Sequence, residues 1–412
     1  MAASLAEQKS AAPEPQRLMS LDALRGFDMF WILGADAFFY ALHDMIPCAP
    51  TKFLAEELDH AEWQGFHFYD LIFPLFVFMM GISIVFSLAR IIESEGRLAA
   101  VKRVLRRGIL LVAIGLIYSG GFTNPWPDMR LMGVLVRIGL CYTFGGLLFC
   151  FFRTKMLVGI SAALLLGYWA LLTFVPFPDV RPTPGGDAVI TKEGGFTNVM
   201  QLNMASTNLL RGSYIQGVNL TDYLDQKYLP ARKYDGTYDP EGILSTMPAV
   251  VTGLLGIFAG LFVRNRAVPD QKKVLWLVGV GAAGIALGFL WGLEFPVIKK
   301  IWTSSYVLVA GGCSAVLLGA FYWIVDVKKW RAWCQPFVWI GMNPIALYLI
   351  SNFLGGLGYH KLATRLAGGS VKNFFDTHVA AGFGELLISA ISIALFLWLA
   401  NFLYRRKIFI RI

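Results

Sequence analysis

The sequence predicts an all-α protein that crosses a membrane many times. Hydrophobic residues make up 56% of the 412 residues and charged residues only 15%, against about 25% in ordinary globular proteins. The mean hydropathy is +0.58. Several apolar runs are long enough to cross the hydrocarbon core, which takes roughly 20 residues of helix. So little polar surface excludes a water-soluble enzyme, a disordered chain and a nucleic-acid-binding domain.

About ten helical spans are expected between residue 17 and the end. Residues 1–16 form a polar tail without an apolar core, so no cleavable secretory signal is expected there. The polar stretch 179–241 is expected to form one long outer loop. The expected spans are 24–42, 71–89, 108–127, 131–152, 156–178, 242–263, 274–293, 301–325, 337–359 and 386–404.

The basic residues predict that both termini lie on the cytoplasmic side. Lys and Arg concentrate in segments that an even number of spans places on the side of the termini: 90–107, 153–155, 264–273, 328–331 and 405–411. Cytoplasmic loops carry this excess in membrane proteins. The net charge of +9 is therefore a topology signal that also favours contact with anionic lipids, and no nucleic-acid partner is expected.

Four ionisable residues are expected near the outer end of the spans. Asp36 lies late in the first span, Asp70 opens the second, Arg137 lies inside the fourth, and His60 precedes the second. An ionisable group at membrane depth is costly and marks a functional site by default. Two structural alternatives remain open: Asp70 as a helix cap, and Arg137 as an ion-pair partner of Asp36.

Five cysteines are spread without the spacing of a zinc site. No metal and no disulfide framework are expected.

The stretch RLMSLDALRGFDMFWILGAD at 17–36, followed by HAEWQGFHFYDLIFPLFVFMMGIS at 60–83, resembles the heparan-α-glucosaminide N-acetyltransferase family of transmembrane acetyltransferases. The similarity is strongest to its bacterial members. Further matching blocks lie in order to the end of the chain: 129–142, 239–260, 305–312, 325–330, 341–348 and 403–412. The resemblance implies one transmembrane acyltransferase domain over 17–412.

The family transfers acetyl from cytoplasmic acetyl-CoA to the amine of a terminal glucosamine on the far side of the membrane. Its active histidine stands in a His-x-x-Trp-x-Gly motif, which falls here on His60, Trp63 and Gly65. Imidazole suits a general base at neutral pH and could alternatively carry the acetyl group. The expected catalytic residues are His60, Asp36 and Asp70, and the expected sugar-binding residues are Trp63 and Glu241. The expected acetyl-CoA-binding residues are Arg137, Asn343, Arg106 and Arg107.

Two other functions compete with acetyl transfer to an amine. Buried Asp and Arg residues also suit a transporter of amino sugars or oligosaccharides. An O-acetyltransferase of envelope polysaccharide would use the same histidine with a hydroxyl acceptor. The expected setting is a bacterial inner membrane, and a homodimer is a candidate assembly.

Overall fold

The computed structural model describes residues 18–179, 207–353 and 358–410. The predicted tail 1–16 and residues 180–206 of the predicted outer loop lie outside the described residues.

Helices occupy the positions of all the predicted spans. They are α1 (Met19–Phe30) with η1 (Trp31–Ala35) and α2 (Asp36–Met45), α4 (Ile72–Glu95), α5 (Arg97–Tyr118), α6 (Val134–Phe151), α7 (Thr154–Phe174), α11 (Thr246–Arg264), α12 (Asp270–Gly292), α13 (Ser304–Phe321) with η5 (Tyr322–Val327), α14 (Gln335–Gly341) with α15 (Pro344–Phe353), and α18 (Phe383–Arg405). Within the described residues, seven helices are long and apolar enough to cross a membrane. The all-α polytopic fold class is thereby confirmed.

The remaining predicted spans lack that length or apolarity for visible reasons. The first is broken at η1, where Gly34 has a positive φ of 107° inside a π-helical turn. The ninth is divided between α14 and α15. The first half of α5 carries the basic residues that were expected on the cytoplasmic side.

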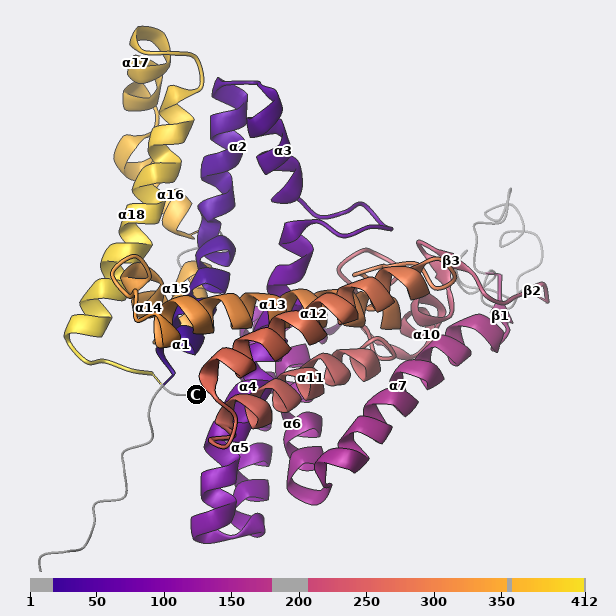
Figure 1. The fold of residues 1–412 in the computed structure, drawn as a ribbon. Coiled ribbons are helices and arrows are strands. Elements are labelled where there is room, and N and C mark those ends of the chain that lie inside the picture. Colours follow the sequence, from indigo (N-terminus) through magenta and orange to yellow (C-terminus); the bar gives the residue numbers. More distant parts are fainter. Residues whose placement is uncertain (1–17, 180–206, 354–357, 411–412) are drawn as a thin grey trace, which may run out of the picture.

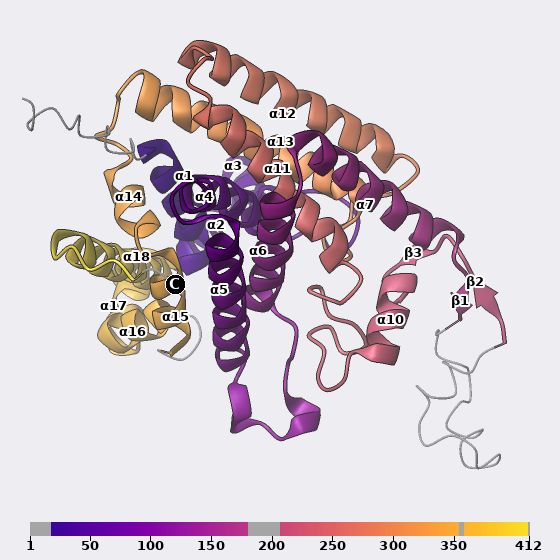
Figure 2. The same cartoon turned by 90° about the horizontal axis from the view of Figure 1, so that it is seen from below.

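The centre of the molecule is a close crossing of α4 and α11, with α6 and α13 packed beside it (Figures 1 and 2). A Cβ at Gly256 would lie 1.9 Å from the Phe78 carbonyl oxygen, and one at Gly81 would lie 2.0 Å from that of Gly253. Only glycine permits backbones to approach so closely. This crossing packs α4 closely against α11 around Phe78 and Gly81.

The break at Gly34 separates the outer segments from this bundle. Beyond it, α2 and α3 (Ala49–Glu57) rise above the crossing helices, beside α18 and the short helices α16 (Gly358–Ala367) and α17 (Ser370–His378) (Figure 1). The chain then returns from α3 through a loop to η2 (Phe68–Leu71), which leads directly into α4. That loop contains the His-x-x-Trp-x-Gly motif.

Short elements form the rest of the outer region. The turns η3 (Gly121–Thr123) and η4 (Trp126–Asp128) connect α5 to α6. Two antiparallel pairs, β1 (Phe177–Pro178) with β2 (Leu209–Leu210) and β3 (Tyr214–Ile215) with β4 (Val218–Asn219), precede α10 (Leu220–Tyr228). The described part of the predicted outer loop is therefore folded against the bundle.

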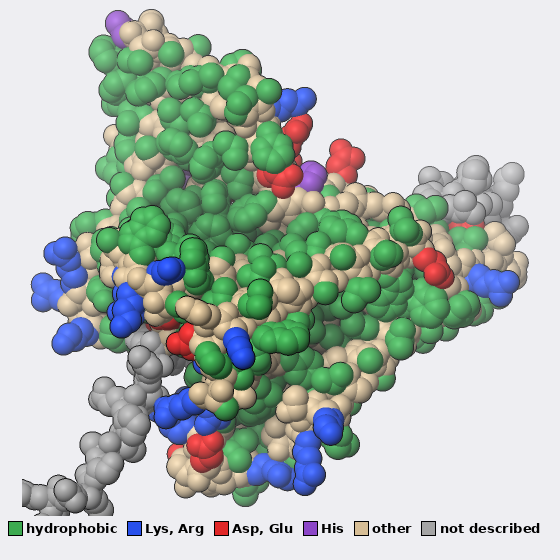
Figure 3. All heavy atoms as spheres, viewed as in Figure 1, with side chains coloured by type: hydrophobic (Ala, Val, Ile, Leu, Met, Phe, Trp, Pro, Cys, Tyr) green, Lys and Arg blue, Asp and Glu red, His purple; other side chains and the backbone are tan. Residues whose placement is uncertain are grey.

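Basic side chains gather at one side of the molecule. The turns that join α4 to α5, α6 to α7 and α11 to α12 lie toward the lower side of Figure 1, and Figure 3 shows Lys and Arg side chains around that side. The α3 loop lies on the opposite side. This separation matches the predicted loop distribution, and the orientation across the membrane stays a prediction.

Candidate active site

His60 lies in the loop between α3 and η2, where its ring meets a buried carboxylate. The His60 backbone N–H donates to the Asp59 carboxylate at 2.7 Å. The imidazole Nδ1 lies 2.9 Å from Asp70 Oδ1. The His60 side chain is 48% exposed, whereas that of Asp70 is 1% exposed. The imidazole is therefore partly accessible while its partner is shielded from water.

Asp70 caps η2 and also contacts the imidazole of His60. Its Oδ2 accepts the backbone N–H groups of Ala61 at 3.2 Å and His67 at 3.0 Å. The bond from His67 caps η2, and Oδ1 remains for His60. Because Asp70 is fixed by the motif loop and by its own helix turn, it can orient the imidazole as an acidic partner does in a catalytic triad.

Lys299 completes this cluster from a distant part of the chain. It belongs to the loop between α12 and α13, and its Nζ lies 2.9 Å from His60 Nδ1, 3.2 Å from His60 Nε2 and 3.3 Å from Asp70 Oδ1. Burial lowers the pKa of the Lys299 ammonium, and the Asp70 carboxylate opposes part of that shift. A carboxylate, an imidazole and an ammonium therefore share one small volume.

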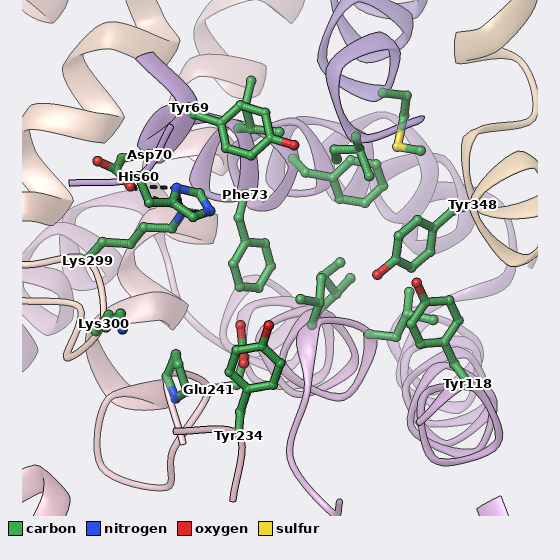
Figure 4. Close-up of a pocket in the computed structure, with 18 of the residues that line it drawn as sticks. His60, Tyr69, Asp70, Phe73, Tyr118, Tyr234, Glu241, Lys299, Lys300 and Tyr348 are labelled. Carbon is green, nitrogen blue, oxygen red and sulfur yellow. Dashed lines mark hydrogen bonds and ion pairs between the residues drawn. The ribbon is translucent and has the colours of Figure 1, made fainter. Parts of the chain in front are cut away.

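These groups open onto a cavity of about 490 Å³, a size suited to a small-molecule ligand. Figure 4 shows His60, Asp70 and Lys299 at one end, Tyr118 and Tyr348 at the other, and Phe73 between them. The tyrosine rings stack with centroids 4.6 Å apart. The lining residues are Met29, Ile32, His60, Ala61, Tyr69, Asp70, Ile72, Phe73, Phe76, Tyr118, Arg130, Val134, Leu135, Ile138, Tyr234, Asp235, Pro240, Glu241, Lys299, Lys300, Ile345 and Tyr348.

A second charged group contributes to the cavity wall. Arg130 donates to both oxygens of Asp239, at 2.9 and 2.8 Å, and to Glu241 at 2.6 Å. Its guanidinium also lies 4.6 Å from the centroid of the Tyr234 ring. Burial acts to raise the pKa of Asp239, but hydrogen bonds and attraction from Arg130 outweigh it and hold that pKa below its ordinary value. Burial raises the pKa of Glu241.

Of the predicted site residues, the structure brings His60, Asp70 and Glu241 to this cavity. Trp63 is not among the residues that line the cavity, and its indole N–H donates to the Tyr214 carbonyl at 2.7 Å. Asp36 is hydrogen-bonded to Tyr69, which lines the cavity.

The residues predicted to bind acetyl-CoA lie elsewhere in the fold. Arg137 is fully buried, contacts Ser245 and the Gly242 carbonyl, and faces the Trp302 ring at 5.1 Å. It thus lies among helix-core groups, away from the alternative partner Asp36. Asn343 is also fully buried.

The Asn343 amide connects α15 to the C-terminal tail. It donates to the Ile408 carbonyl and accepts from the Ile410 N–H, both at 2.9 Å. Arg106 is exposed on α5, whereas Arg107 lies over the Tyr142 ring at 4.8 Å. Roles for these residues in binding acetyl-CoA stay predictions.

Sequence reasoning missed Lys299, Lys300 and Arg130. The two lysines lie in the short segment FPVIKKIW between two spans, on the side where basic residues are unexpected. Arg130 stands in the family-like block at 129–142. In both cases the signal was a basic residue in a loop that the predicted topology places on the outer side, but its partners are distant in sequence. Among the described residues, no group of His, Cys, Asp and Glu is arranged to hold a metal ion.

Comparison with known proteins gives this geometry a family context. Residues 17–182 match the family model of the heparan-α-glucosaminide N-acetyltransferase catalytic domain. The human heparan-α-glucosaminide N-acetyltransferase is 28% identical over 97% of this chain, and the mouse protein of the same name is 27% identical over 86%. The chain spans 60% of the length of the human protein and 56% of the mouse protein. The chain is therefore similar to the heparan-α-glucosaminide N-acetyltransferases over most of its length.

Proposed function

We propose that this protein is a transmembrane acetyltransferase that moves acetyl from acetyl-CoA to the amine of a terminal glucosamine or related amino sugar. The observation that carries the proposal is the imidazole of His60, held at 2.9 Å by the buried Asp70 at the end of a ligand-sized cavity. The family relationship supports the same reaction class.

The His60–Asp70 pair supplies the base that the reaction needs. When Asp70 accepts the proton of Nδ1, the lone pair of the ring is on Nε2. That nitrogen can take a proton from the attacking amine as the carbon–nitrogen bond forms, and the thiolate of CoA leaves with a proton. Alternatively, Nε2 itself attacks the thioester carbonyl and the C–S bond breaks, so that CoA leaves as the thiolate and takes up a proton. The amine then attacks the acetyl group of the acetyl-imidazole, loses its proton, and imidazole leaves.

The acceptor is proposed to lie between His60 and the charged wall at Glu241. Glu241 and the neighbouring Asp235 provide hydrogen-bond acceptors for hydroxyl or ammonium groups, and Trp63 supports the loop that carries His60. Acetyl-CoA, too large and anionic to cross lipid, is proposed to reach His60 from the cytoplasmic side. Arg106, Arg107, Arg137 and Asn343 remain the candidates for its path. The proposed setting is a bacterial inner membrane containing anionic lipids, with a homodimer as the assembly to test.

Purified protein in lipid nanodiscs, given radiolabelled acetyl-CoA and a panel of acceptors, tests the proposal. The panel contains glucosamine, glucosamine-terminated oligosaccharides and sugars that have only hydroxyl groups. Label should appear on amines, and His60→Ala should abolish its transfer. The matched control is His378→Ala, because His378 is an exposed histidine on α17 that stacks on Phe374.

The other outcomes separate the competing functions. Label on hydroxyl-only sugars would indicate an O-acetyltransferase. Failure of acetyl-CoA to bind, with sugar uptake into proteoliposomes in its absence, would indicate a transporter. Incubation with acetyl-CoA alone, followed by mass spectrometry of the His60 peptide, distinguishes an acetyl-imidazole intermediate from direct transfer.

A further inference from the structure

Lys299 is held in place by its loop rather than by its long side chain alone. Its neighbours Ile298 and Ile301 are fully buried. The Val297 carbonyl accepts the Gly65 N–H at 3.0 Å, which fastens this loop to the loop that contains His60. Thr303 then caps α13 by accepting the Tyr306 N–H. These contacts fix the position of the loop between α12 and α13, and with it the position of the Lys299 ammonium beside the imidazole.

The distances place the ammonium against the face of the imidazole. Lys299 Nζ lies 2.9 Å from Nδ1 and 3.2 Å from Nε2. The ring nitrogens are separated by a single carbon and their in-plane directions diverge. A point at nearly equal, short distance from both cannot lie in the plane of the ring without overlapping its carbons. The ammonium thus leaves the outward direction of Nε2 available.

Carboxylates and one ammonium surround the His60 ring. Asp70 and Lys299 contact the ring and each other, with Nζ 3.3 Å from Oδ1. The Tyr69 ring lies 4.9 Å from the imidazole centroid, and Asp59 accepts the His60 backbone N–H. Asp36, which is hydrogen-bonded to Tyr69, is close enough to His60 for the two groups to interact electrostatically. Without Lys299, the imidazole would face carboxylates alone, and these favour its protonated form, which has no lone pair.

We propose that Lys299 is a positioning residue that offsets the charge of Asp70, so that a carboxylate orients His60 while the neighbouring ammonium disfavours protonation of its ring. This inference deepens the proposed function, on which its catalytic consequence rests. A neutral imidazole with an oriented Nε2 is the form required of either a base or an acetyl carrier. The same ammonium disfavours positive charge on the ring after it has accepted a proton or acetyl group, and so promotes onward transfer.

The test measures the protonation of His60 without requiring acetyl transfer. Diethylpyrocarbonate acylates neutral imidazole, so its rate of reaction at the His60 peptide, followed by mass spectrometry across pH, reports the neutral fraction. In Lys299→Met, the reactivity profile should move to higher pH by about one unit, a tenfold change in the neutral fraction at acidic pH. Lys299→Arg should restore the wild-type profile.

Two further variants make the result decisive. Lys300→Met removes the adjacent lysine, which pairs with Asp235 at 2.9 Å, and should move the His60 profile by no more than a few tenths of a unit. Asp70→Asn, which leaves Lys299 in place, should move it to lower pH. Unchanged profiles in Lys299→Met and Asp70→Asn would overturn the proposal. If Lys299→Met does not fold, Lys299→Gln and the opposite shift in Asp70→Asn provide the same test.

Activity measurements connect this charge balance to turnover. In Lys299→Met, kcat at acidic pH should fall about tenfold and recover toward higher pH, with KM for the acceptor unchanged. A shifted reactivity profile in a protein that transfers no acetyl would support the role of Lys299 and contradict the proposed function. Failure of the role proposed for Lys299 and failure of the proposed acetyltransferase function therefore give different results.

Discussion

Replacing Asp70 by asparagine is the most informative change at the site. Asp70 Oδ1 accepts from His60 and contacts Lys299, while Oδ2 accepts two backbone N–H groups. Asparagine keeps one oxygen and places an NH₂ group where the other was. In one orientation that group faces two backbone donors; in the other it faces the imidazole and the ammonium. Either arrangement leaves buried donors unsatisfied.

The expected losses follow from those contacts. Leaving the Lys299 ammonium without its carboxylate costs about 3–5 kcal/mol of unfolding free energy, as for other broken buried ion pairs. Loss of the acidic partner of a catalytic histidine typically lowers kcat by about 10⁴-fold. The assay is acetyl transfer from radiolabelled acetyl-CoA to glucosamine at saturating substrate, with thermal unfolding measured on the same preparations.

Asp222→Asn is the matched control. Asp222 is a fully buried carboxylate that accepts the Gly217 N–H at 2.8 Å and the Asn219 amide at 2.6 Å, within the outer segment that leads into α10. This variant should lose stability while kcat is retained. If folded Asp70→Asn protein keeps kcat within about tenfold of the wild-type value, Asp70 does not orient the reacting imidazole and the reasoning fails.

Three further predictions concern packing, the charged wall and pH. Gly256→Ala should lower the melting temperature because its Cβ would meet the Phe78 carbonyl at 1.9 Å, whereas Gly279→Ala, with open space around it, should not; equal melting temperatures would contradict the close crossing. Arg130→Lys loses the fork that holds Asp239 and Glu241, so thermal unfolding should show a loss of about 1–3 kcal/mol; an unchanged stability would contradict that network. Burial raises the pKa of Asp225 to about 6, so the folded state keeps a proton that the unfolded chain releases near pH 4; this group should make stability fall as pH rises from about 4 to about 6, by at most about 3 kcal/mol. Chemical unfolding of wild type and Asp225→Asn at both pH values checks this, and an equal change in unfolding free energy with pH in the two proteins would refute it.

Local features of the sequence determined the spans and the first half of the site. In lipid, the backbone N–H and C=O groups of an apolar run must hydrogen-bond to one another because water is absent, and an α-helix achieves this within one segment. His60 and Asp70 are only ten residues apart, so a short loop and a helix start suffice to bring them together. The same proximity explains why Asp70 serves as both cap and imidazole partner.

Tertiary structure decided which distant residues join them. Lys299 is 239 positions from His60, and Arg130 is 109 positions from Asp239. Their meeting depends on how α12, α13 and the outer segment pack, which hydrophobic periodicity leaves unspecified because every span has more than one apolar face. Helix packing likewise decides that Arg137 lies over the Trp302 ring and that Asn343 hydrogen-bonds to the C-terminal tail. A sequence indicates that a charge lies within the membrane, but only the packed helices select its partner.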